Sequence, residues 1–311
     1  MRVQPGLIRK AALSGFVLAL ALAACGKTAS DSAPPASDPA SSAAVSPSAS
    51  SAASPEAGVP ASHPGSSDSG PGKADASGPA DSPQTGADES PPEGGGQPKY
   101  RLNKAYRIVP IDESAAPKQV VLLTFDDGPK DAGTLGKILD ALGKHDAKAI
   151  FFVNGYRVKA NPELLKEIDA RGHAIGNHSY DHINLRQQSD EIIREQIESV
   201  QEQVRELTGK TPKFFRPPYG AANDTVKAVA KENGMLFMTW SNGSLDWDLG
   251  KNVRDKPQAV IDHVMEQLHP GSNILMHELE WTADALDLLL TQLEEKGYGF
   301  VDPDDIAIDP E

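Results

Sequence analysis

Two adjacent carboxylates, Asp126 and Asp127, are the residues with the clearest capacity for chemistry in this chain. They follow the apolar run 120–123 and precede Gly128-Pro129, a pattern that predicts a buried strand ending abruptly at the two acids. Burial of a carboxylate is costly unless a cation or hydrogen bonds compensate it, so we expect a metal or an arginine nearby. If only Asp126, Asp127 and Gly128 are considered, the alternative is an ordinary solvent-exposed turn.

Two histidines, His178 and His182, stand four residues apart further along the chain. One helical turn or a tight loop would bring their imidazoles to the same side. With the carboxylate of Asp127 they would form a three-ligand site with an open position for water, as in catalytic zinc sites. This donor set suits zinc and also admits cobalt or manganese. Two polar loop histidines without a metal are the alternative.

Two more residues whose side chains could take part in catalysis stand at the ends of later predicted strands. Arg216 precedes Pro217 and Pro218, which fix the backbone as it leaves the strand, and its guanidinium can clamp a carboxylate. His277 ends the last internal strand, where an imidazole that titrates near neutrality can act as a general acid. A surface arginine and a core histidine are the alternatives.

Alternating strand-like and helix-like stretches must position these residues. The predicted strands are 119–125, 148–153, 173–177, 213–216, 235–240, 273–277 and 298–301, and the predicted helices are 132–144, 162–170, 189–208, 223–233, 257–268 and 282–296. About seven strand-then-helix units predict a parallel sheet in a closed or nearly closed barrel, with an open doubly wound sheet as the alternative. In such barrels functional groups gather at the carboxyl ends of the strands, where the polar residues above stand.

Five motifs, TFDDGP, NHSYDH, RPPYG, SLDW and LMH, occur in this order between about residues 118 and 303. They resemble the five motifs of the NodB-type polysaccharide deacetylases, carbohydrate esterase family four. The resemblance implies an α/β fold, a distorted (β/α)7 barrel. It also implies metal-dependent removal of N-acetyl, sometimes O-acetyl, groups from a polysaccharide.

The resemblance also implies roles for individual residues. They are a general base at Asp126, metal ligands at Asp127, His178 and His182, an arginine that orients the base at Arg216, a general acid at His277, an oxyanion donor in the backbone N–H of Tyr219, and walls of the groove and acetate pocket at Tyr219, Trp247 and Leu275. One position departs from the pattern, because Gly243 stands where the fourth motif usually has an aspartate. Asp246 and Glu278 are the candidates to partner the arginine and the acid in its place.

The N-terminal region predicts export and a tether. Residues 1–24 have a basic start and an apolar segment too short to span a bilayer, which is typical of a signal peptide. Leu22-Ala23-Ala24-Cys25 resembles the bacterial lipobox, which implies lipid attachment at Cys25, the only cysteine. A plain secretory signal is the alternative. Residues 25–98 are rich in Ser, Ala, Pro and Gly without apolar periodicity, so we expect a disordered tether.

The remaining residues, 99–311, predict one catalytic domain. The chain has 44 acidic and 30 basic residues, a balance that disfavours nucleic-acid binding. We expect an extracytoplasmic monomer, anchored to the bacterial membrane through lipid, that deacetylates peptidoglycan amino sugars, because a lipoprotein on a flexible arm meets the cell wall first. The motifs do not separate N-acetylglucosamine from N-acetylmuramic acid.

Three alternatives stay open. One is an intracellular hydrolase of the same fold, which would require that Cys25 is irrelevant. A chitin-like or O-acetylated polysaccharide could replace peptidoglycan as substrate. A wall-binding protein that keeps the metal and the groove but has lost turnover is the rival from another class, and Gly243 is its only support.

Overall fold

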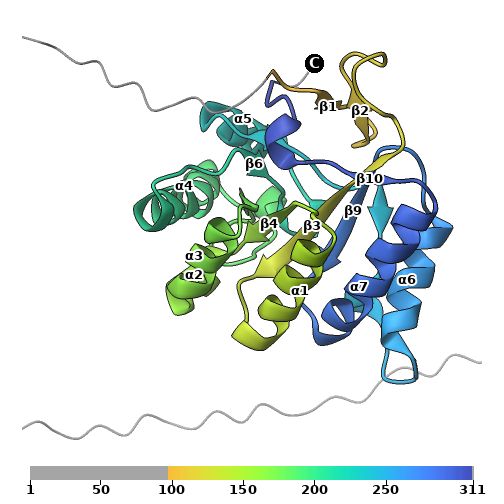
Figure 1. Cartoon of the computed structure of the whole chain (residues 1–311). Coiled ribbons are helices and arrows are strands. Elements are labelled where there is room, and N and C mark those ends of the chain that lie inside the picture. The colour runs from red at the N-terminus through yellow and green to blue at the C-terminus, as the bar shows by residue number, and fades with distance from the viewer. Residues whose placement is uncertain (1–96, 310–311) are drawn as a thin grey trace, which may run out of the picture. The chain divides into compact units, whose positions relative to one another are not determined.

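The computed structural model describes residues 97–309 (Figure 1). The predicted signal peptide, Cys25 and almost all of the predicted tether lie outside the described residues, so these predictions stay untested. Within 97–309, no helix is long and apolar enough to cross a membrane.

One parallel sheet forms the centre of the described domain. Its strands are β3 (Val120–Gly128), β4 (Ala149–Val153), β5 (Ala174–Asn177), β6 (Phe214–Phe215), β7 (Leu236–Phe237), β8 (Asn242–Gly243), β9 (Ser272–His277) and β10 (Gly299–Phe300). Their order is β7-β6-β5-β4-β3-β9-β8, and β10 pairs with the start of β3. Because β9 returns to pair with β3 while β7 and β8 are unpaired with each other among the described strands, the sheet is a distorted, incompletely closed barrel. The predicted (β/α)7 fold is therefore confirmed, and the open doubly wound sheet is excluded.

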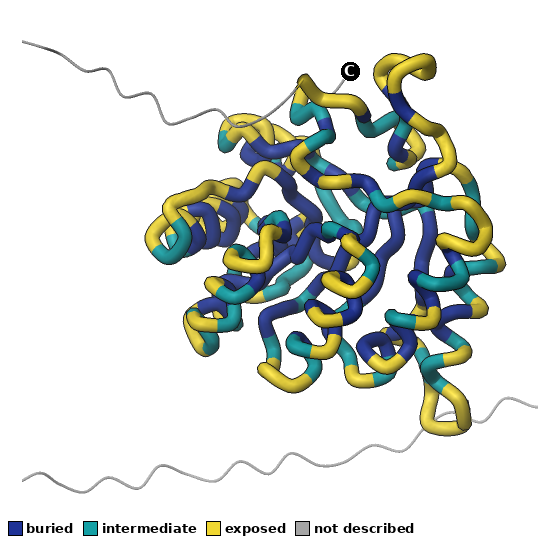
Figure 2. Tube along the Cα trace, in the orientation of Figure 1, coloured by how far each residue is buried: buried dark blue, intermediate teal, exposed yellow. Residues whose placement is uncertain are grey.

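In the described part of the chain, seven α-helices lie around the sheet, and Figure 1 shows them on its outer side. They are α1 (Ala132–Lys144), α2 (Gly155–Ala160), α3 (Pro162–Ala170), α4 (Asp190–Thr208), α5 (Asp224–Glu232), α6 (Lys256–Glu266) and α7 (Glu280–Glu295). The six predicted helices are confirmed to within one or two residues at most of their ends, and α2 was missed. Figure 2 shows burial concentrated on the strands and on the helix faces that meet them.

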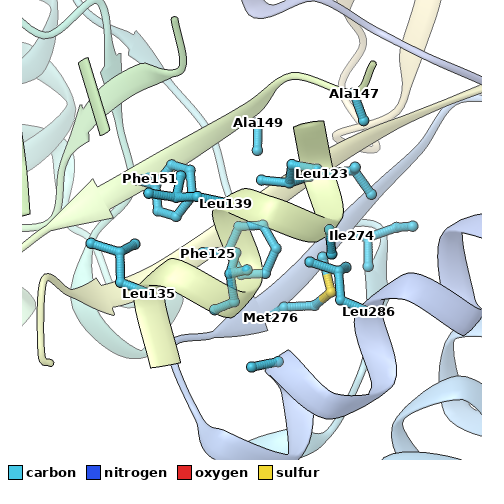
Figure 3. Packing of buried hydrophobic residues seen from close by; sticks show 14 of the residues in the cluster. Leu123, Phe125, Leu135, Leu139, Ala147, Ala149, Phe151, Ile274, Met276 and Leu286 are labelled. Carbon is cyan, nitrogen blue, oxygen red and sulfur yellow. The ribbon is translucent and has the colours of Figure 1, made fainter. Parts of the chain in front are cut away.

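The side chains of β3 alternate between two environments. Leu123 and Phe125 pack against α1 and α7 in the outer core (Figure 3). Leu122 belongs to a separate inner cluster, and Thr124 and Asp126 follow it on the same face of the strand. The inside of the barrel therefore changes from apolar to polar towards the carboxyl end of β3.

A short antiparallel hairpin, β1 (Tyr100–Leu102) and β2 (Ile108–Pro110), packs at the amino end of β3. The N–H of Ile108 donates to the carbonyl of Gly271 at 2.9 Å, and the N–H of Gly271 donates to the carbonyl of Val120 at 2.9 Å. Gly271 has a φ of 73°, and a Cβ there would lie 2.0 Å from the Ile108 carbonyl oxygen. Only glycine fits this contact, which closes the end of the barrel opposite to the polar strand ends.

Candidate active site

The end of β3 presents two successive carboxylates to the same site because the strand is irregular there. Its register against β4 shifts between Asp126 and Gly128, and Asp127 has a left-handed φ of 69°. Side chains of consecutive residues in a regular strand point to opposite faces, and such a bulge re-aims one of them. Asp126 is buried, whereas Asp127 is partly exposed.

Asp127, His178 and His182 converge at this end of the barrel. The Oδ1 atom of Asp127 lies 3.1 Å from Nε2 of His182 and 3.5 Å from Nε2 of His178. Their possible ligand atoms all lie within 4.8 Å of one another, and no other set of His, Cys, Asp or Glu within 97–309 meets this criterion. Oδ1 of Asp127 is buried and makes no hydrogen bond of good geometry. Three donor atoms around one point, one of them unsatisfied, fit a divalent cation.

The protonation states of these residues also suit a metal. Nδ1 of His178 lies 2.7 Å from the carbonyl oxygen of Arg216, and since a carbonyl only accepts, Nδ1 carries the hydrogen and Nε2 keeps its lone pair. Burial lowers the pKa of His178, which favours the neutral imidazole. Burial alone would raise the pKa of Asp127, but the imidazoles of His182 and His178 hold it below its usual range. A neutral imidazole and a charged carboxylate are the forms that bind metal.

Arg216 is fully buried beneath the site and holds Asp126 in place. One guanidinium nitrogen donates to Oδ1 of Asp126 at 2.7 Å and to the hydroxyl of Thr124 at 2.8 Å. The other donates to the side-chain oxygen of Asn273 at 3.2 Å. Oδ2 of Asp126 lies 3.7 Å from Nε2 of His178, so this oxygen faces the proposed metal ligands. Sequence reasoning missed Thr124 and Asn273, although strand alternation places Thr124 on the same face as Asp126.

His277 ends β9 and is paired with a buried carboxylate. Its Nδ1 lies 2.7 Å from Oδ1 of Asp246, and its backbone N–H donates to Oδ2 of Asp246 at 2.7 Å. The hydroxyl of Thr282, also missed from the sequence, donates to the same Oδ2 at 2.7 Å. Burial alone would lower the pKa of His277, but the bond to Asp246 raises it above its usual value. The raised pKa favours the protonated imidazole, which is the form that a general acid needs.

The comparisons with known proteins agree with this geometry. The model of the polysaccharide deacetylase family matches residues 113–238. The chain is 37% identical over 196 residues to the peptidoglycan-N-acetylmuramic acid deacetylase PdaA of Bacillus subtilis, a match that covers 62% of this chain and 73% of PdaA. It is 39% identical over 189 residues to a peptidoglycan-N-acetylglucosamine deacetylase of Bacillus cereus, covering 59% of this chain and 66% of that protein. A solved structure of a CE4 family pseudoenzyme from Bacillus anthracis is also similar, with 34% identity and a TM-score of 0.55 over 59% of this chain and 63% of the other.

The chain belongs to the polysaccharide deacetylase family. It is therefore a hydrolase that acts on amide bonds, and its barrel is the one that its motifs imply. Similarity to a pseudoenzyme makes the residue at each motif position important. In this deacetylase every position to which the motifs assign a role carries the implied residue, except Gly243.

Asp246 provides the carboxylate that Gly243 lacks, because it pairs directly with His277. The side chain of the other candidate, Glu278, makes no hydrogen bond or ion pair with His277 or Arg216 among the described residues. Its Oε1 instead accepts the backbone N–H groups of residues 130–131 at 2.7 and 3.1 Å. Glu278 therefore fixes the loop after β3 in the deacetylase.

Three residues were predicted to line the groove, and the structure places two of them on its rim. The side chain of Tyr219 is exposed, and its ring centroid lies 4.8 Å from that of His182 in an edge-to-face arrangement. Trp247 is exposed too, with its ring centroid 5.2 Å from that of His277. Leu275 is buried on β9, two residues before His277, so it can wall only the floor of the site. The two aromatic rings thus flank the proposed ligands on one side and the proposed acid on the other.

Proposed function

We propose that this deacetylase removes N-acetyl groups from the amino sugars of peptidoglycan with the help of a divalent cation. The observation that carries the proposal is the meeting of three chemical groups at one end of the barrel. They are the cluster of Asp127, His178 and His182, the ion pair of Asp126 with Arg216, and the ion pair of His277 with Asp246. Relatives that are named peptidoglycan deacetylases support the choice of substrate.

Asp127, His178 and His182 would hold the cation, and their donor set suits zinc. When bound, the cation supplies Lewis acidity that polarises the acetyl carbonyl. Asp126, oriented by Arg216, accepts a proton from the attacking water as general base. The N–H of Tyr219 donates to the developing oxyanion.

His277 completes the reaction by donating its proton to the departing nitrogen. An unprotonated amine is a very poor leaving group, so amide hydrolysis depends on this transfer. Asp246 stabilises the imidazolium before the proton is given up. The products are acetate and the free amino sugar. Ser179 and Ser241 lie outside a nucleophile elbow, so we assign neither of them a covalent step.

Acetate release from purified peptidoglycan tests this function. We expect the zinc-loaded protein to release acetate, and Asp126→Asn to release it at least about 100-fold more slowly because the general base is lost. Asp248→Asn changes an exposed aspartate in the turn that follows β8, so it is the matched control and should keep the rate. Binding of peptidoglycan without any acetate release would favour the wall-binding alternative.

We also propose that the protein is anchored to the outer face of the bacterial membrane by lipid on Cys25, with residues 26–98 as the tether. Their composition supports an end-to-end distance of about 45 Å for a flexible chain of this length. Radiolabelled palmitate should be incorporated into the full chain and not into Cys25→Ala. Equal labelling of both proteins would contradict the anchor.

A further inference from the structure

A cavity of about 470 Å³ lies at the amino ends of β5 and β6. His173 and Lys213, the residues that precede these two strands, both line it. His178 and Arg216 follow the same two strands at their other ends, in the active site. Because a strand rises about 3.3 Å per residue, the four residues of β5 separate these two ends by about 13 Å. The cavity is therefore distinct from the active site.

His173 is a buried polar residue of this cavity that lacks a partner. The residue is 6% exposed, and its Nδ1 is buried without a hydrogen-bond partner. Its ring packs on the core residue Phe151, with 5.4 Å between the ring centroids. Burial, together with the charges of Lys148 and Arg171, lowers the pKa of His173 to about 4, so the imidazole is neutral at neutral pH. A neutral imidazole has one donor and one acceptor, and a buried polar atom without a partner is costly unless a ligand or water pairs with it.

The charges around the cavity compensate one another. Nζ of Lys210 lies 2.7 Å from Oδ1 of Asp169, and Nζ of Lys213 lies 3.7 Å from Oδ1 of Asp304. All four residues line the cavity. A strongly charged ligand would have to separate one of these pairs. A neutral ligand with hydroxyl groups would instead accept from the ammonium groups and donate to the carboxylates while the pairs stay together.

The other walls of the cavity are apolar and preformed. The buried side chains of Ile175, Val204 and Phe214 line it. Nε2 of Gln201 fixes the loop between α4 and β6 by donating to the carbonyl of Pro212 at 3.1 Å. The cavity thus combines an apolar surface with a neutral imidazole and compensated charges. A sugar ring has the matching pair of surfaces, because its C–H groups are apolar and its hydroxyl groups both donate and accept.

We infer that this cavity is a second, non-catalytic binding site for a neutral N-acetylhexosamine unit of the glycan. Such a unit carries no charge, and its acetamide methyl adds apolar surface for the inner walls. The choice of a cell-wall glycan rests on the proposed function, whereas the recognition of a neutral sugar rests on the cavity. A site at the opposite end of the barrel binds a different segment of polymer from the one being deacetylated, and it would hold the enzyme on the wall between reactions.

Nuclear magnetic resonance of the histidine side chains tests the second site. The probe is the tetrasaccharide of N-acetylglucosamine. The protein is the zinc-loaded full chain with isotope-labelled histidine and with Asp126→Asn, which prevents turnover. His173 reports on the cavity and His277 on the active site, and each resonance is assigned from the spectrum of a glutamine variant at that position. We expect both resonances to shift saturably, with separate dissociation constants.

Two variants at the rim of the cavity separate local binding from an effect transmitted through the barrel. Lys210→Met and Thr211→Val change exposed positions, so both proteins should fold. Each should weaken the dissociation constant reported by His173 about fivefold, as expected for the loss of one hydrogen bond, and leave the constant reported by His277 unchanged. Lys227→Met, at an exposed position of α5 outside the cavity, is the matched control and should change neither constant.

A His173 resonance that does not move during the titration would overturn the second site, because water alone would then occupy the cavity. A His173 shift that keeps its dissociation constant in both rim variants would overturn it as well. Failure of the proposed function gives a different result. A protein that releases no acetate but shows the His173 shift refutes only the proposed function, whereas an active enzyme without that shift refutes only the second site.

Discussion

At the scale of single residues, Arg216 affects both stability and catalysis, because its buried charge is paired with Asp126, the proposed general base. Arg216→Met would leave Asp126 buried without its counter-charge, so we expect the free energy of unfolding to fall by about 3–5 kcal/mol. Urea denaturation of the purified domain measures this. Arg194→Met is the control, because its ion pair with Glu232 is fully exposed to solvent and should contribute little to stability. Equal losses for the two variants would contradict the role given to Arg216.

The pair of Asp246 and His277 makes a prediction about pH. Asp246 raises the pKa of His277, so the protonated acid persists to higher pH and is lost above that pKa. Asp246→Asn should lower this pKa, move the alkaline limb of the kcat profile to lower pH, and reduce kcat by about 100-fold. The exposed Asp248→Asn should leave the limb in place. If the alkaline limb of the kcat profile of Asp246→Asn stays at the pH of the parent protein, a group other than His277 determines that limb.

The choice between Asp246 and Glu278 shows what single residues in a sequence do not reveal. Both are acids close to a motif, and their chemistry is the same. The contact of Asp246 with His277 joins positions 31 residues apart, and it depends on how β8 and the turn after it lie against β9. Residue types and motif order were enough to predict which side chains gather at the strand ends. Tertiary packing decides which of the two carboxylates pairs with His277.

At the scale of elements, the hairpin β1–β2 depends on Gly271. Gly271→Ala would place a Cβ against the Ile108 carbonyl in a left-handed conformation, so we expect a loss of about 1–3 kcal/mol in the free energy of unfolding. Gly136→Ala is the control, because that helical position has open space around it and alanine should stabilise it by up to about 1 kcal/mol. Urea denaturation compares the two variants, and unchanged stability of Gly271→Ala would contradict the contact.

Elements with local signals were predicted well, and elements without them were missed. For α4, Ser189 caps the amino end by accepting the N–H of Ile192, and Gly209 ends the helix with a φ of 73°, both as the sequence indicates. By contrast, β8 has two residues and α2 has six, which is too short for a hydrophobic period to appear. The bulge that turns Asp127 towards the histidines arises from pairing with β4, which local sequence does not encode.

At the scale of the whole molecule, the barrel brings ligands from two distant loops to one point, so metal should stabilise the folded state. With free zinc at 100 times its dissociation constant, we expect about 2.7 kcal/mol of stabilisation and a Tm higher by about 5–10 °C. Differential scanning calorimetry with and without zinc measures this shift. His178→Ala should abolish most of it, whereas His145→Ala, which removes a histidine at the end of α1, should not. A zinc-independent Tm would contradict the proposed ligand set.

The most direct test of the central claim is acetate release from peptidoglycan by metal-free protein titrated with zinc. The geometry of Asp127, His178 and His182 predicts negligible release without metal, a rise that reaches a plateau near one zinc per chain, and no rise in His182→Ala. A full rate after removal of metal by a chelator, or a zinc response that persists in His182→Ala, would contradict the claim that these three residues hold a catalytic metal.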